Sequence, residues 1–112
     1  MAVGAQLSVT EQRQSARHPV NFPVIAEHRI RGDIRMHIAN ISAHGFMADQ
    51  APELSRGDRV IVRLPQVGRI EAYCMWISRE RAGFQFERII RQDDFVALIA
   101  ELQPNPRLRH RS

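Results

Sequence analysis

Apolar and polar residues alternate along most of the chain, which is the period of β-strands with one face buried. The alternating segments lie between turn residues, and they predict strands over residues 20–30, 34–41, 45–49, 57–64, 69–78 and 83–87. Pro23 in the first segment favours an edge position or a bulge, and Gly32-Asp33 predicts a hairpin turn. Five or six short, evenly spaced strands indicate a mainly β fold, a small antiparallel barrel.

The period changes near the C-terminus. The apolar residues that recur at helical spacing within residues 91–103 are Phe95, Leu98, Ile99 and Leu102. Asp93 and Asp94 suit the positive end of a helix dipole, and Pro104 stops the helix. We therefore expect one C-terminal α-helix whose apolar stripe covers an open end or a flank of the barrel.

The length of 112 residues fits one domain, and 44% hydrophobic residues favour a folded chain. We expect a tail over residues 1–11, the domain over residues 12–103 and a basic tail over residues 104–112. No apolar run reaches the roughly 18 residues of a membrane span. The N-terminus lacks a signal-peptide pattern, and the single Cys74, expected as a small core residue, fits a reducing compartment. These features predict a cytoplasmic protein.

The positive charge of the chain comes from arginine, because all 16 basic residues are Arg. The net charge is +4. Codon bias in a GC-rich genome is a sufficient explanation, but the chemical consequence holds. Arginine binds phosphate and the O6/N7 edge of guanine bidentately, which lysine does less well. The arginines are spread along the sequence, so no general nucleic-acid face is evident.

Two short motifs carry the candidate chemistry. The first is a pair of arginines, Arg13 and Arg17, with three residues between them. The second is the turn of residues 40–45 (NISAHG), whose Asn and Ser can bond nearby backbone or a ligand and whose Gly45 permits a tight bend. Taken singly, the first motif also fits a solvated tail, and the second fits a plain polar turn.

Together the motifs resemble those of the PilZ domain family, which binds the bacterial second messenger cyclic di-GMP. The family pattern is RxxxR followed by (D/N)xSxxG, and here Arg13 and Arg17 precede Asn40, Ser42 and Gly45. The resemblance continues through the later strands, over roughly residues 12 to 102. It implies a six-stranded antiparallel barrel with a flanking helix, which agrees with the pattern of the sequence.

The resemblance also implies roles for the motif residues. Arg13 is expected on the Hoogsteen edge of a guanine, and Arg17 on the phosphates. Asn40 is expected on the other guanine, Ser42 near a phosphate or ribose, and Gly45 where the backbone approaches the ligand. Two guanidiniums would neutralise the two phosphate charges of the ligand.

Four further positions lie in or beside this pattern. Gln12 stands where many family members have another arginine, so one supplementary cation is missing here. Trp76 could stack on a guanine if it points outward, although its place in line with apolar residues of the same strand favours the core equally. His18 and His44 adjoin the motifs and are secondary candidates for ligand contact. The histidines and Cys74 show no metal-ligand spacing, so we expect no metal.

These features predict a stand-alone cyclic di-GMP receptor with no catalytic residues and no cofactor. Its N-terminal arginine segment would fold over the ligand and signal to a downstream protein that the sequence does not identify. One alternative is a protein-interaction module with a vestigial nucleotide site. Another is a barrel that binds RNA or DNA, which is disfavoured because its aromatic residues look mostly internal.

Overall fold

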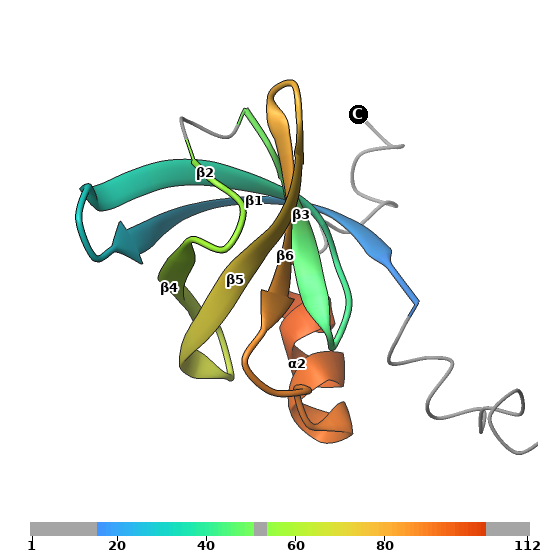
Figure 1. Ribbon diagram of the computed structural model, residues 1–112. Coiled ribbons are helices and arrows are strands. Elements are labelled where there is room, and N and C mark those ends of the chain that lie inside the picture. The colour runs from blue at the N-terminus through green and yellow to red at the C-terminus, as the bar shows by residue number, and fades with distance from the viewer. Residues whose placement is uncertain (1–15, 51–53, 103–112) are drawn as a thin grey trace, which may run out of the picture.

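The computed structural model describes residues 16–50 and 54–102. They form six strands and one helix: β1 (His18–His28), β2 (Gly32–Ile41), β3 (Gly45–Asp49), β4 (Arg59–Leu64), β5 (Gly68–Ser78), β6 (Arg81–Phe86) and α2 (Gln92–Leu102). The strands close into a barrel in the order β1-β2-β3-β6-β5-β4, and neighbouring strands are antiparallel (Figure 1). The predicted six-stranded antiparallel barrel with a C-terminal helix is confirmed.

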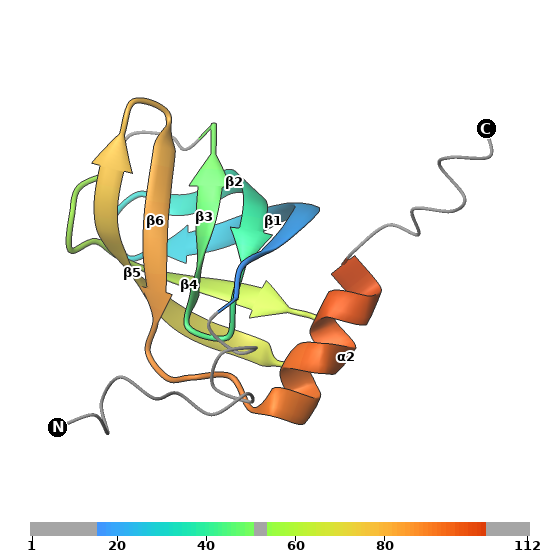
Figure 2. The ribbon, with the colours of Figure 1, turned by 90° about the vertical axis from the view of Figure 1, so that its right-hand side faces the viewer.

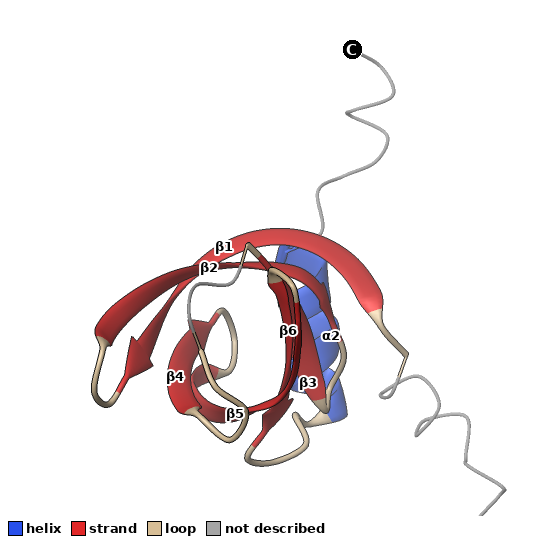
Figure 3. Cartoon of the chain, turned by 45° about the horizontal axis from the view of Figure 1, so that its top comes forward, coloured by secondary structure: helices blue, strands red, loops and turns tan. Residues whose placement is uncertain are grey.

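The core consists of the inward-facing side chains of the alternating segments, around which the strands curl (Figure 3). The ring of Phe46 in β3 stacks on that of Phe84 in β6, with centroids 4.7 Å apart, and it also contacts Phe86 at 5.6 Å. Aromatic pairs at these separations add to the stabilisation that burial gives. The two phenylalanines of β6 point inward, as the alternation predicts.

The helix α2 lies across one end of the barrel (Figure 2). It buries the side chains of Phe95, Leu98 and Leu102, which belong to the predicted apolar stripe. The ring of Phe95 also meets His18 at the start of β1, with centroids 5.5 Å apart. In the described ranges, no helix is long and apolar enough to cross a membrane.

The turn between β1 and β2 lies earlier than the sequence predicts. The pattern places it at Gly32 and Asp33, but both belong to β2, and the turn is residues 29–31. The ring of His28 explains the shift, because its Nδ1 accepts the backbone N–H groups of the last two turn residues, both at 3.1 Å. A side chain that satisfies turn donors in this way fixes where the strand ends.

Pro23 lies in the part of β1 that pairs with β2 and not with β4. The pairs between β1 and β4 within the described residues involve Glu27 and His28 alone, and the β1–β2 register shifts between Pro19 and Phe22. A proline has no N–H to give to a neighbouring strand, so it is suited to this uncovered edge. The predicted edge or bulge position of Pro23 is therefore confirmed.

Candidate functional site

The turn between β2 and β3 is closed by Ser42. Its N–H donates to the carbonyl oxygen of Gly45 at 2.8 Å, and its Oγ accepts the N–H of His44 at 3.1 Å. Only 2% of Ser42 is exposed. The hydroxyl therefore stabilises the turn from within, as serine does in such bends. Its predicted contact with a ligand stays a prediction.

Gly45 is required by its neighbour across the barrel wall. A Cβ on Gly45 would lie 1.9 Å from the carbonyl oxygen of Phe84. Gly45 pairs with Gln85, so the backbones of β3 and β6 approach each other closely at this point. Only glycine permits this approach, which is one of the uses of glycine in strands. The last residue of the NxSxxG motif thus has a structural reason to be glycine before any ligand is considered.

Arg17 meets the turn motif directly. Its Nη1 donates a hydrogen bond to Oδ1 of Asn40 at 3.0 Å, although the two residues are 23 positions apart. The pairing of β1 with β2 brings them together, because Pro19 is in register with Asn40. The fold therefore joins the second arginine of RxxxR to the first residue of NxSxxG. Arg13 lies outside the described residues.

Trp76 lies on the outside of the barrel because β5 contains a bulge. Cys74 is 1% exposed and Trp76 is 40% exposed, although they would share a face in a regular strand. The β5–β6 register shifts between these two residues, which turns the indole outward. The core position that the alternation equally favoured is thus excluded for Trp76. The predicted core position of Cys74 is confirmed.

The thiol of Cys74 supports this bulge. Its Sγ donates to the backbone carbonyl of Trp76 at a distance of 3.6 Å. Burial raises the pKa of the Cys74 thiol above its ordinary value, and the charge of Asp58 raises it further. The thiol therefore keeps its proton at neutral pH and remains a donor to the carbonyl of the bulge.

A cavity of about 370 Å³ lies where these features meet. Its lining residues are Arg17, His44, Gly45, Met75, Trp76, Gly83, Phe84 and Gln85. The guanidinium of Arg17 can bind an anion, and the indole can stack on a planar ring. A cavity with this lining suits a flat, anionic ligand. His18 packs on α2 and does not line the cavity.

Four lining residues escaped the sequence interpretation of the site: Met75, Gly83, Phe84 and Gln85. The available signal was Gly83, a glycine inside a strand, which often marks a place where another group approaches closely. Here that group is the indole of Trp76, which is in register with Gly83. Met75 and Gln85 had no signal, because an exposed polar or apolar residue on a strand is ordinary. Phe84 was predicted as a core residue, and it is 3% exposed.

Comparison with known proteins bears on the family and on the fold. The model of the PilZ domain family matches residues 11–102. A crystal structure of the PilZ domain of CeSA from a cellulose-synthesizing bacterium superimposes with a TM-score of 0.57 at 18% sequence identity. The match covers 77% of this chain and 94% of that one, and at this identity it shows a shared fold. No curated protein matches the sequence.

Proposed function

The chain belongs to the PilZ domain family, and we propose on this premise that it is a cyclic di-GMP receptor. PilZ domains are binding modules, and we assign no catalytic role to any residue of this one. Cyclic di-GMP offers two phosphate charges and two guanine rings. In the cavity beside Trp76, the guanidinium of Arg17 complements the phosphates and the exposed indole complements a guanine ring. The glycines of the lining let a ligand approach the backbone closely.

One observation carries the proposal: the hydrogen bond from Arg17 to Asn40 at 3.0 Å. It joins the guanidinium of Arg17, which lines the cavity, to the amide of Asn40 in the second motif, which does not line the cavity itself. Because the Asn40 oxygen holds one Nη of Arg17, the remaining donors of that guanidinium are available to a phosphate or guanine. A pre-positioned arginine loses less side-chain entropy on binding.

The remaining roles follow from this arrangement. Arg17 binds the phosphates, Asn40 orients Arg17 and contacts a guanine edge, and Trp76 stacks on a guanine face. Ser42 and Gly45 hold the turn in the shape that these contacts need. The closure of the segment carrying Arg13 over the ligand, and the resulting signal to a downstream protein, fall on residues outside the described ranges and stay predictions.

Isothermal titration calorimetry with cyclic di-GMP tests the proposal. The double variant Arg13→Ala/Arg17→Ala should lose about 100-fold or more in affinity, because each charge-assisted hydrogen bond contributes about 1.5–3 kcal/mol. Affinity should also fall as salt is added, since the contacts are ionic.

The matched control is Arg63→Ala/Arg88→Ala, which removes the same charge from two exposed residues away from the cavity. It should bind cyclic di-GMP as the parent chain does. Equal affinity of the double motif variant and the parent would remove the two arginines from the mechanism. A folded parent chain that ignores cyclic di-GMP would favour the alternative, a protein-interaction module with a vestigial site.

A further inference from the structure

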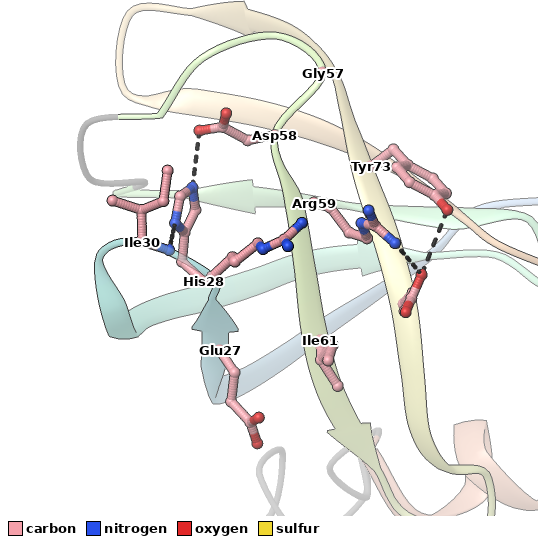
Figure 4. Close-up of a pocket in the computed structure, with 10 residues that line it drawn as sticks. Glu27, His28, Ile30, Gly57, Asp58, Arg59, Ile61 and Tyr73 are labelled. Atoms are coloured by element: carbon pink, nitrogen blue, oxygen red, sulfur yellow. Dashed lines mark hydrogen bonds and ion pairs between the residues drawn. The ribbon is translucent and has the colours of Figure 1, made fainter.

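A second cavity, of about 580 Å³, opens on the outer face of the barrel where β1 meets β4 and β5. We call it the seam groove, and its lining residues are Glu27, His28, Arg29, Ile30, Gly57, Asp58, Arg59, Ile61, Glu71 and Tyr73 (Figure 4). None of them lines the cavity beside Trp76. The two cavities share strand β5, on which Tyr73 and Trp76 both lie.

The seam groove is preformed because His28 ties its walls together. The side chain of His28 is 8% exposed, and its Nε2 lies 3.2 Å from Oδ2 of Asp58. Since Nδ1 accepts two backbone N–H groups, the ring proton sits on Nε2 and is donated to Asp58. Asp58 also accepts the N–H of Ser55 at 3.0 Å. With both nitrogens engaged, His28 is a structural link between the walls of the groove.

The acidic residues of the groove are already paired within the chain. Oε2 of Glu27 accepts a hydrogen bond from Nη1 of Arg69 at 3.5 Å. Oε1 of Glu71 lies 3.4 Å from Nη1 of Arg59 and also 3.4 Å from the hydroxyl of Tyr73. With the link between His28 and Asp58, each carboxylate in the lining has a partner within the chain.

Arg29 is the exception among the charged residues of the groove. It is exposed, and it has no hydrogen-bond or ion-pair partner among the described residues. The lining contains three carboxylates and two guanidiniums, and the charge in it that has no partner among the described residues is the positive charge of Arg29, on the β1–β2 turn. A carboxylate from outside the chain is its natural counterpart.

Apolar surface lies next to this charge. Ile30 is 86% exposed at the tip of the turn, and Ile61 lies half-buried in the groove. The ring of Tyr73 carries the Arg59 guanidinium above it, 5.9 Å from the centroid. Tyrosine and arginine beside an apolar surface are enriched in the energetically important parts of protein interfaces.

We propose that the seam groove docks a segment of a partner protein in which an acidic residue adjoins an aliphatic one. The carboxylate pairs with Arg29, and the aliphatic side chain covers Ile30 and Ile61. Because the groove is preformed, its lining residues need little ordering when the partner segment binds. That this groove is the output surface of a receptor rests on the proposed function; that it binds acidic peptides does not.

A phage-displayed random peptide library, selected on the full chain without cyclic di-GMP, tests the proposal. Enriched peptides should place Asp or Glu beside Leu, Ile or Val. The tightest one, synthesised with a fluorescent label, should bind Arg29→Glu with an affinity lower by about tenfold or more. Ile30→Asn should also weaken it, and backbone amide shifts on titration should centre on Ile30, Ile61 and Tyr73.

Arg88→Glu is the matched control, because it makes the same charge reversal at an exposed arginine outside the groove. It should bind the labelled peptide as the parent chain does. Failure to enrich acidic peptides, or equal binding by Arg29→Glu and the parent, would overturn the proposal. Binding to phosphatidylglycerol vesicles that depends on Arg29 and Ile30, without peptide enrichment, would overturn it in favour of a lipid surface.

The two proposals fail separately. Arg29→Glu should retain the cyclic di-GMP affinity of the parent chain, since Arg29 lines only the seam groove. If the parent chain binds the acidic peptide but not cyclic di-GMP, the docking proposal stands and the receptor proposal is overturned. If it binds cyclic di-GMP but no acidic peptide, the receptor proposal stands and the docking proposal is overturned.

Discussion

The indole ring of Trp76 lies directly against Gly83, the residue opposite it on β6. A Cβ on Gly83 would fall 2.0 Å from Nε1 of the indole, so the ring occupies the space that any side chain would need. The contact holds an exposed aromatic ring flat on the barrel wall, beside Arg17. The orientation of the candidate stacking surface thus depends on a glycine that need not touch the ligand.

Gly83→Ala should therefore displace the ring of Trp76. We expect a shift in tryptophan emission and a loss of about tenfold in affinity for cyclic di-GMP, because stacking on an aromatic ring contributes about 1–3 kcal/mol. The emission is easy to interpret, since Trp76 is the single tryptophan of the chain. Fluorescence spectra and calorimetric titration of the variant and the parent measure both effects.

A double-mutant cycle controls this prediction. In a Trp76→Ala background the methyl group has no ring to displace, so adding Gly83→Ala should change the affinity little further. Additive losses would show that the methyl group acts by another route. Unchanged emission in Gly83→Ala would show that the ring does not rest on the glycine.

Gly45→Ala should destabilise the fold even without a ligand. The new Cβ would lie 1.9 Å from the carbonyl oxygen of Phe84, and a backbone atom in a closed barrel has little freedom to move away. Forcing atoms into a packed site costs typically about 1–3 kcal/mol. Urea unfolding without cyclic di-GMP measures this change in the free energy of unfolding.

Gly32→Asn is the comparison for this effect. Gly32 has a φ of +78°, and no atom lies within 4 Å of the place that a Cβ would take. Asparagine tolerates this backbone conformation better than most residues do. The free energy of unfolding should therefore fall less in Gly32→Asn than in Gly45→Ala. Equal stability of Gly45→Ala and the parent would mean that β3 and β6 can separate at low cost.

Most of the fold was predictable because the alternation is strong and local. The helix of residues 92–102 lies within the predicted 91–103, and β2 ends at Ile41 as predicted. Strand starts were less accurate. β6 begins at Arg81 and not at Gly83. Arg81 and Ala82, which the sequence pattern assigns to a turn, pair with the last two residues of β5. Pairing across a hairpin can extend a strand beyond its apolar pattern.

The motif residues of the candidate site could be named from the sequence, but their arrangement in space could not. The pairing of Arg17 with Asn40 depends on the register of β1 and β2, which no local pattern contains. The bulge before Trp76 changes the face of every later residue in β5, and alternation assumes that no such residue is inserted. The link from His28 to Asp58 joins residues 30 positions apart, so only the closed barrel reveals it.

The hydrogen bond between Arg17 and Asn40 predicts different outcomes for two substitutions of Asn40. Asn40→Asp keeps an oxygen that accepts from Arg17, whereas Asn40→Leu has a similar volume and no acceptor. Asn40→Leu should lose about tenfold to 100-fold in cyclic di-GMP affinity, the worth of one hydrogen bond to a charged group. Asn40→Asp should lose less, and calorimetric titration of both decides this. Equal losses would mean that the amide N–H₂ group, and not the oxygen, carries the role of Asn40.

Asp58 should make the stability of the barrel sensitive to acid. The N–H of Ser55 is the main cause that lowers the pKa of Asp58 below its ordinary value of 3.8, and His28 lowers it further. The unfolded chain then binds the proton more tightly than the folded chain does. The stabilisation is complete above pH 3.8 and is lost as pH falls through the lowered folded pKa.

Asp58→Asn removes this titration. The variant should be less stable than the parent at neutral pH, because the neutral amide oxygen of asparagine accepts from His28 and from the N–H of Ser55 more weakly than the carboxylate does. The difference between the two should shrink as pH falls below 3.8, since the parent then loses the same interaction by protonation. Urea unfolding of both proteins at a series of pH values measures this difference.

Asp33→Asn, at an exposed carboxylate of β2, is the control. The difference in the free energy of unfolding between this variant and the parent should stay near zero at every pH. If the gap between Asp58→Asn and the parent stays constant down to strongly acidic pH, the carboxylate of Asp58 does not hold the seam of the barrel together through its charge.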